Sequence, residues 1–321
     1  LETSNITHNS TKSQQSLSSS DTGPYEEGFR NYARIALAQA GVVATNSGVE
    51  IQQRIEAQNI ANSGWNYTSS SSDITLQFWF RCSTNQTFYG YLYTFDGTNQ
   101  LYCFSFTASA NNTWTKITKT IPGNSNLTFN NDNGPGLQLK FIAFYGTDYT
   151  NDLTLNQWGA FVNGNQMPDM ASTWLTAGAS TFDVTGIQLE VGSQATAFEH
   201  HSFGEEERLC QRYYFKQSGD ALSYFGSGNI DGGSQAQILV DFVTEMRTAP
   251  TSLDTSGTAS DYFIRVTTNA TCTSVPTLSN RTTKNALVEF YSTSHGFTSG
   301  YSCFGRRSNV SDSYLGFSAE L

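Results

Sequence analysis

The chain has 321 residues, of which 37% are hydrophobic and 14% charged, and its formal net charge is −10. Because a single domain usually has about 100 to 200 residues, we expect two domains. The 17 Lys and Arg are scattered along the chain, which argues against a nucleic-acid partner, since phosphate binding needs clustered cations. No run of about 18 apolar residues occurs, so we expect no membrane insertion.

Residues 1–24 form a polar tract with almost no apolar side chain. Such a tract cannot bury apolar area by itself, and we therefore predict a polar N-terminal arm. Any order in this arm is expected to come from packing against neighbouring subunits or another protein.

From residue 25 onward the pattern is one of short strands, and the clearest of them is 73–82, DITLQFWFRC. Its residues alternate with a period of two, so one face should pack in a core and the other should meet solvent or a partner. The face expected to pack carries Ile74, Leu76, Phe78, Phe80 and Cys82. Further strands are predicted at 34–40, 50–57, 87–95, 100–107, 113–121, 137–146 and 182–191.

Turn-forming pairs such as Asp96-Gly97 and Pro122-Gly123 separate these strands, and no long helical periodicity is present. The pattern predicts an all-β fold, a jelly-roll β-sandwich over residues 25–200. A linker with a short helix is predicted at 201–212. A second, smaller β-rich domain is predicted over 213–321, with strands near 221–226, 235–243, 261–268, 286–291, 299–304 and 313–320.

The segment 182–214 reads FDVTGIQLEVGSQATAFEHHSFGEEERLCQRYY, and it resembles a junction that recurs in phage tail-fibre and other virion surface proteins. Blocks in fixed order, from I-x-Q-x-I-E through I-T-L-x-F-W-x-R to N-T-W-x-K-x-x-x-x-I-P-G, resemble the carbohydrate-binding-module-like jelly roll of that family over about residues 30–200. The sequence Glu245-Met246-Arg247-Thr248-Ala249-Pro250 resembles a turn of phage tail C-terminal domains.

This resemblance implies a structural protein on the surface of a tailed phage virion, synthesised in the host cytoplasm. It implies a homotrimeric tail fibre that recognises host surface glycan and contacts other virion proteins through the N-terminal arm. Two alternatives stay open, namely a capsid decoration protein or head fibre, and a secreted polysaccharide-binding or polysaccharide-degrading protein.

The five cysteines have no C-x-x-C spacing, so a zinc site is not expected. Cys82 and Cys103 lie in predicted strands and could face each other, but buried free thiols are the favoured interpretation. His200 and His201 lie beside several glutamates, yet neighbouring His side chains diverge, so a solvated linker is favoured over a metal site. Glu205 is better explained, with Glu206, as an acidic first turn of a helix.

No catalytic motif is recognisable, and no pair of carboxylates can be nominated for glycoside hydrolysis. The asparagines around Asp132 lack the spacing of a dedicated calcium loop, so a surface turn is favoured there. We therefore expect no catalysis, no metal and no cofactor.

Aromatic residues are plentiful, with 5 Trp, 16 Tyr and 22 Phe. Exposed rings flanked by polar groups suit sugar binding, because the ring face packs on the C–H face of a pyranose. The candidate carbohydrate-binding residues are Tyr67, Trp79, Tyr213, Tyr214 and Tyr224. The alternative is that these rings, and Trp114 as well, serve the core, strand pairs or subunit contacts.

Overall fold

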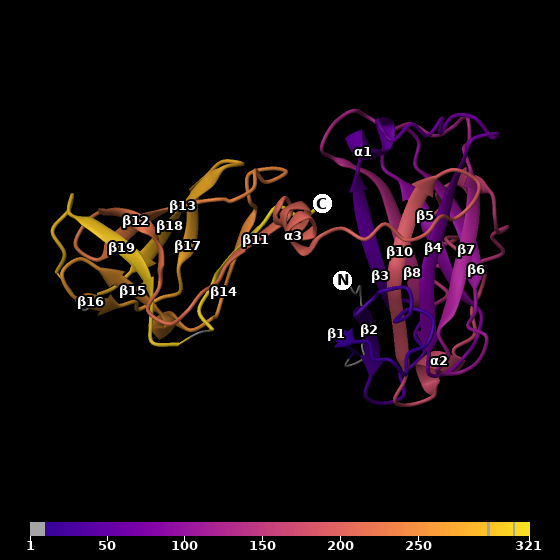
Figure 1. Ribbon diagram of the computed structural model, residues 1–321, viewed down its shortest axis with the longest axis horizontal. Helices are drawn as coiled ribbons and strands as arrows, with labels where there is room; N and C mark the ends of the chain where they lie inside the picture. The colour runs from indigo at the N-terminus through magenta and orange to yellow at the C-terminus, as the bar shows by residue number, and fades with distance from the viewer. Residues whose placement is uncertain (1–9, 294–295, 311) are drawn as a thin grey trace. The chain divides into compact units, whose positions relative to one another are not determined.

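A computed structural model describes residues 10–293, 296–310 and 312–321. The chain divides into two compact units, Leu1–Glu199 and His200–Leu321, and each is described by itself. Most of the regular secondary structure in both units is antiparallel strand (Figure 1), so the predicted all-β fold is confirmed.

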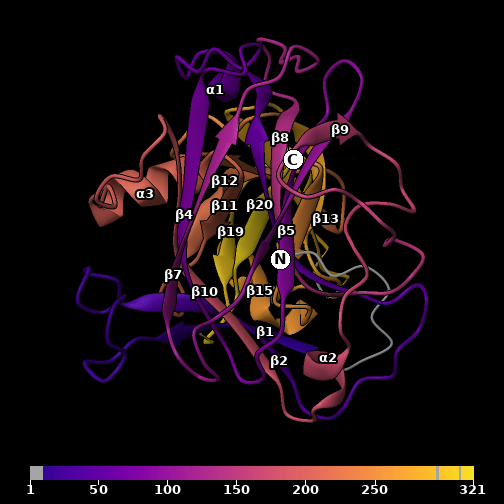
Figure 2. The same ribbon diagram turned by 90° about the vertical axis from the view of Figure 1, so that its right-hand side faces the viewer.

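The first unit is a sandwich of two five-stranded sheets (Figures 1 and 2). One sheet has the order β1 (Ser10–Ser16), β2 (Asn31–Leu37), β10 (Thr181–Val191), β4 (Asp73–Cys82) and β7 (Thr115–Pro122). The other has the order β3 (Gly48–Glu56), β8 (Pro135–Tyr145), β5 (Phe88–Thr94), β6 (Gln100–Phe106) and β9 (Trp158–Ala160). Two short helices, α1 (Ala57–Ala61) and α2 (Thr173–Thr176), lie in the connections.

Aromatic side chains from both sheets fill the space between them. The Phe78 ring lies 4.6 Å from that of Phe141 in the opposite sheet, and the Phe80 ring lies 4.9 Å from that of Phe106. All of these rings are buried. An edge-to-face pair such as Phe80 and Phe106 contributes about 0.5–1.5 kcal/mol beyond burial.

Strand β4 shows the predicted alternation on its inner face, where every residue from Ile74 to Cys82 at period two is buried. Its outer face differs from the expectation of contact with solvent or a partner, because the chain covers it. The Thr75 hydroxyl donates to the Gly192 carbonyl at 2.7 Å, and the Gln77 amide donates to that of Thr196 at 2.7 Å. The segment after β10 therefore buries half of this face.

The other half of the outer face is covered by residues 18–30, which a charged cluster holds in place. The Asp183 carboxylate is fully buried and accepts hydrogen bonds from Arg34 at 2.7 and 2.8 Å and from Arg81 at 3.0 Å. Arg81 also donates to Asp21 at 2.7 Å, and the Trp114 indole N–H donates to the same Asp21 oxygen at 3.1 Å. We call these five residues the Asp183 cluster.

The prediction of a polar N-terminal arm is corrected in part. Strand β1 pairs with β2 along its whole length, from Ser10 opposite Leu37 to Ser16 opposite Asn31, and the two lie side by side in both views (Figures 1 and 2). The expectation that order in this segment comes from neighbours is wrong for residues 10–16, because backbone hydrogen bonds to β2 replace the missing apolar burial. Residues 1–9 of the predicted arm lie outside the described residues.

The second unit packs a three-stranded sheet against a seven-stranded sheet. The smaller has the order β11 (Tyr214–Gln217), β20 (Leu315–Ser318) and β14 (Ser252–Thr255). The larger has the order β16 (Asn269–Thr271), β15 (Tyr262–Arg265), β19 (Ser302–Arg307), β12 (Tyr224–Ile230), β13 (Gln235–Asp241), β18 (Asn285–Tyr291) and β17 (Thr277–Arg281). A 3-10 turn, η1 (Ala259–Asp261), precedes β15. Strands β11, β14, β16 and β17 were not predicted, and β12 and β19 lie about three residues later than expected.

Helix α3 (Phe203–Gln211) opens the second unit. Ser202 and Glu205 form a capping box, in which the serine side chain and the glutamate side chain each satisfy a backbone N–H. Hydrogen bonds from Ser202 lower the pKa of Glu205. Glu205 and Glu206 thus lie in the first turn, where the sequence placed them.

All five cysteines are free thiols. Cys82 lies in the core between the two sheets, whereas Cys103 belongs to a cluster on the opposite face of its sheet, so the two do not face each other. Burial raises the pKa of Cys82 and of Cys272 to about 12 and that of Cys303 to about 11, and it raises the pKa of Cys103 as well. Cys210 on α3 is exposed.

A thiol reagent should therefore modify Cys210 in the native protein and reach the other four thiols only after unfolding, because burial blocks both access and thiolate formation. Reaction with Ellman's reagent, followed by absorbance before and after denaturant is added, measures this. The variant Cys210→Ser should remove the fast phase. Two or more thiols reacting at the same fast rate in the native protein would contradict the described burial.

We expect the Asp183 cluster to make the free energy of unfolding depend on pH in the acidic range. Burial opposes ionisation of Asp21, but hydrogen bonds from Ser18 and Trp114 and the charge of Arg81 together lower the pKa of Asp21 below 3.8. A lowered folded-state pKa stabilises the protein above the unfolded-state value, and this contribution is lost as the pH falls through the folded-state pKa. Asp21→Asn should cost about 1–2 kcal/mol at neutral pH.

The gap in unfolding free energy between wild type and Asp21→Asn should shrink as the pH drops below about 4. Urea unfolding followed by tryptophan fluorescence at several pH values measures the gap. Asp148→Asn, an exposed aspartate outside the cluster, is the matched control and should leave stability unchanged. A gap that stays constant down to the lowest pH would show that the Asp21 charge does not contribute.

Candidate functional site

Trp79 lies on the outer face of β4, beneath residues 18–30. Its indole N–H donates to Glu27 at 2.9 Å, and Lys116 pairs with the same carboxylate at 3.0 Å. A Cβ at Gly23 would come within 2.6 Å of the ring, so the backbone lies directly against it. Gly23 has a φ of +94°, a conformation that favours glycine. The Trp79 ring packs against the loop of residues 18–30. This is the structural role that was the alternative to sugar binding.

Tyr67 lies in the connection between α1 and β4 and is half-buried. Its ring packs edge-to-face on Phe129 at 5.0 Å and lies 6.2 Å from Trp65, both of which belong to the core. One face of the Tyr67 ring therefore packs against the core and cannot contact a ligand.

Tyr213 and Tyr214 are half-buried at the start of β11. The Tyr214 hydroxyl donates to Asp254 at 3.1 Å, and burial together with that carboxylate raises the pKa of Tyr214. The backbone of Tyr213 is held by Cys210 and Ala319. These two rings belong to the join between α3 and the small sheet.

Tyr224 is the one predicted site residue that the structure leaves broadly open, with 49% of its surface exposed. It lies on β12, on the face of the seven-stranded sheet that points away from the core. Phe304 on the neighbouring β19 is 46% exposed, and the two ring centroids lie 5.3 Å apart at an angle of 59°. Both rings thus lie on an open sheet surface.

Polar groups border the two rings. Arg306 lies opposite Tyr224 in the strand register, with its guanidinium 5.3 Å from the ring centroid. Arg306 donates to the Leu222 carbonyl at 2.8 Å and to Asn269 Oδ1 at 3.1 Å. Arg265 donates to the same Asn269 oxygen at 3.2 Å. We call Tyr224, Phe304, Arg306, Arg265 and Asn269 the aromatic face.

This arrangement can bind a ligand that is apolar on one side and hydroxylated at its edges. The rings supply a surface for C–H groups, and the guanidinium groups supply fixed donors. Because both arginines use Asn269 Oδ1, the Nδ2 group is the part of that amide which a ligand can meet. The rigid strands hold all five residues, so little ordering is needed on binding.

Sequence reasoning found Tyr224 but missed its neighbours. Phe304 and Arg306 stand at alternate positions of β19, with Cys303, Gly305 and Arg307 facing inward between them. The strand was predicted about three residues too early, at 299–304, which hid this alternation.

The five-stranded sheet that contains β5 carries a second set of tyrosines on its face away from the core. Tyr91 is 2% exposed and donates to Gln166 at 3.0 Å, so residues 147–170 cover this part of the sheet. Tyr93 is half-buried between Phe95 and Phe161, each 4.8 Å away. The period-two tyrosines of FYGYLYT are the sequence signal for this surface.

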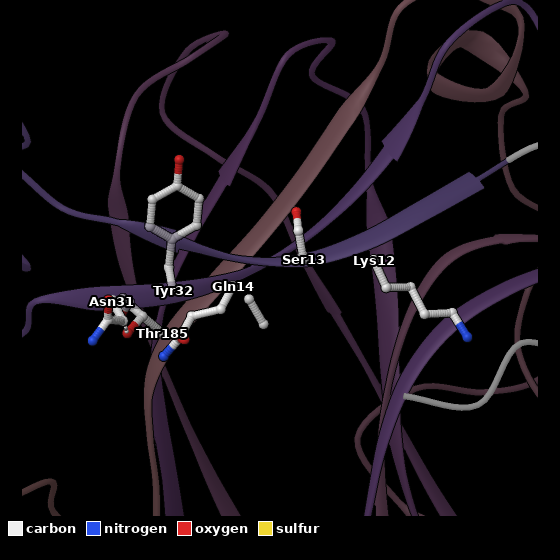
Figure 3. A pocket seen from close by; sticks show the side chains of 7 residues that line it. Lys12, Ser13, Gln14, Asn31, Tyr32 and Thr185 are labelled. Atoms are coloured by element: carbon white, nitrogen blue, oxygen red, sulfur yellow. Dashed lines mark hydrogen bonds between the residues drawn. The ribbon is translucent and has the colours of Figure 1, made fainter. Parts of the chain in front are cut away.

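A cavity of about 460 Å³ lies beside β1 and β2 (Figure 3). It is lined by Lys12, Ser13, Gln14, Asn31, Tyr32, Ala33 and Thr185. Figure 3 shows the Tyr32 ring on one side of the strand pair, with Gln14, Asn31 and Thr185 on the other. The Tyr32 ring packs edge-to-face on Trp114 at 5.3 Å and points away from the Gln14 side, so this groove suits sugar stacking less well than the aromatic face.

Among the described residues, no group of three or more His, Cys, Asp and Glu side chains is placed to hold a metal ion. His201 approaches Glu206 at 3.2 Å on the surface of α3. Within the same described ranges, no helix is long and apolar enough to cross a bilayer.

No protein-family model matches the chain, and no curated protein matches it. Among solved structures, a CBM4 structure is similar at 14% identity and a TM-score of 0.27, covering 50% of this chain and 71% of that one. The N-terminal cellulose-binding domain of Cellulomonas fimi β-1,4-glucanase C is 11% identical, with a TM-score of 0.28 and coverages of 51% and 80%.

The enzymatically active domain of tailspike protein 4 of bacteriophage CBA120 is 10% identical, with a TM-score of 0.28. The match covers 59% of this chain and only 20% of that one. Because the identities and TM-scores are this low, these similarities do not assign a function. Any assignment has to rest on the residues of this chain.

Proposed function

We propose that this chain is a non-enzymatic surface protein of a tailed phage, a homotrimeric tail fibre that binds host surface glycan through the aromatic face. The glycan part rests on one observation, the pair of half-exposed rings, Tyr224 and Phe304, fixed on a sheet beside guanidinium and amide groups. The virion part rests on the junction at residues 182–214, which resembles that of phage tail-fibre proteins.

A pyranose would lay its C–H face on the two rings, and its hydroxyls would accept from Arg306 and from the Asn269 amide. The surface is open, so each contact is weak and readily reversed. Three copies on one particle would convert weak contacts into firm attachment through effective concentration. The net charge of −10 would disfavour approach to strongly anionic polymers, whereas the guanidinium groups of Arg306 and Arg265 add local positive charge at the face.

A second candidate role for the same surface is contact with another copy of the chain. Leu239 on β13 is 43% exposed and lies on the same side of the sheet as Phe304, with strand β12 between them. The added apolar surface favours an interface between chains. Loss of the trimer in Tyr224→Ala, measured by light scattering after size exclusion, would support this role over glycan binding.

Tyr224→Ala and Phe304→Ala should each weaken glycan binding by about tenfold, because each removes a stacking surface worth about 1 kcal/mol or more. The assay is an array of bacterial surface polysaccharides probed with the full chain. Tyr301→Ala, at a tyrosine of similar exposure outside the aromatic face, is the matched control and should bind like wild type. Wild-type binding by both variants would remove the aromatic face as the glycan site.

Antibody raised against residues 213–321 should label the tails of intact virions in electron micrographs. Label over the capsid would instead indicate a decoration protein or head fibre. Particles without any label would reject the virion assignment, while leaving the glycan assay unaffected.

A further inference from the structure

We propose a second ligand site, in the first unit, that takes a neutral pyranose such as the terminal residue of a glycan. The site is a cavity of about 350 Å³ at the end of β8, within the range of small-molecule sites. It is lined by residues of three segments, 43–45, 144–150 and 169–172. It shares no residue with the aromatic face and goes beyond the function proposed above.

The walls of this cavity are fixed by the backbone. The N–H of Gly146 donates to the Ser47 carbonyl at 2.8 Å, and that of Asp148 donates to the Thr45 carbonyl at 2.9 Å. A Cβ at Gly146 would come within 2.2 Å of the Ala44 carbonyl oxygen, so the two segments lie in direct contact. A pre-formed cavity loses little entropy when it is filled.

The opposite wall is tied to the sheet as well. The Tyr145 N–H points to the sulfur of Met170 at 3.2 Å, and Thr150 forms a parallel bridge with Met167. Residues 167–172 therefore hold their distance from the end of β8, and the cavity stays open.

One carboxylate and several hydroxyls supply the polar chemistry. Asp169 is exposed to the cavity mouth, and its Oδ1 accepts from the hydroxyl of Thr150, which is 6% exposed. This hydrogen bond orients the carboxylate and leaves Oδ2 as an acceptor for sugar hydroxyls. Thr45, Thr147 and Ser172 add hydroxyls that can both donate and accept.

Aliphatic groups at the rim supply the accessible apolar surface, and buried aromatic residues form the wall behind them. Tyr145 is 5% exposed, and its hydroxyl is held by Glu50 and lies 3.4 Å from the Lys140 ammonium. Phe144 and Met170 line the cavity beside it, and Val43, 52% exposed, forms part of the rim. Hydroxyls around an apolar patch match the two kinds of surface on a pyranose ring.

Charge narrows the ligand class. Of the described residues that line the cavity, none is Lys, Arg or His, and Asp169 is the single ionisable carboxylate. An anionic ligand such as a phosphate, sulfated sugar or sialic acid would meet repulsion without a compensating cation. A neutral sugar meets a charge-assisted acceptor instead.

The test is saturation-transfer NMR on the full chain, with a panel of methyl glycosides of common neutral hexoses, deoxyhexoses and N-acetylhexosamines at millimolar concentration. At least one glycoside should bind wild type. Asp169→Asn should weaken that binding about tenfold, since a hydrogen bond to a charged group is lost. Ala44→Phe, a substitution at a half-buried lining residue, should block the cavity and, combined with Tyr224→Ala so that the aromatic face does not contribute, should abolish the signal.

Asp148→Asn, a neighbouring exposed aspartate outside the lining, is the matched control and should bind like wild type. Wild-type binding by both Asp169→Asn and Ala44→Phe would overturn the site, and so would the failure of every glycoside to bind. Loss of the signal in Tyr224→Ala alone would assign it to the aromatic face, which overturns this site and supports the other one. Thermal unfolding of each variant verifies that it is folded.

Discussion

The buried Asp183 carboxylate is the interaction on which the surface of the first unit depends. A buried ion costs several kcal/mol unless its partners compensate, and here Arg34 and Arg81 both bond to it. Arg81 then reaches Asp21 and lies 4.4 Å from the Trp114 ring centroid, which fixes residues 18–30 over the sheet. The outer-face aromatic residues of this sheet are consequently used to hold the chain together.

The second unit arranges its arginines differently, and this leaves one face of its larger sheet uncovered. Arg306 and Arg307 are adjacent in β19 and point to opposite sides of the sheet. Arg307 is 1% exposed, lies 4.2 Å from the Phe225 ring centroid, and donates to the carbonyls of Ser313 and Gln217 at 3.0 and 2.7 Å. It ties β11 to β19 from inside, while Arg306 serves the aromatic face outside. The strands that carry the aromatic face are therefore packed on their core side and exposed on the other side.

The sequence was most informative where one side chain decides its own environment. The alternation of β4 predicted its inner face residue by residue, because apolar groups such as Phe78 and Phe80 have one favourable place. The outer face could not be predicted in this way. Gln77 and Thr75 look the same whether water or a distant segment satisfies them, and the segment that does so lies more than 110 residues away. The same limit applied to Trp79, whose covering loop lies about 50 residues earlier, and to Phe304, whose strand was placed too early.

Side-chain protection by a bound glycan tests the central claim most directly. Hydroxyl-radical footprinting, read by mass spectrometry, compares oxidation of the full chain alone and with the polysaccharide that gives the strongest array signal. Oxidation should fall at Tyr224 and Phe304 and stay unchanged at Val243, which is 76% exposed and serves as the internal reference. Undiminished oxidation at both aromatic residues, with the polysaccharide demonstrably bound, would contradict recognition through the aromatic face.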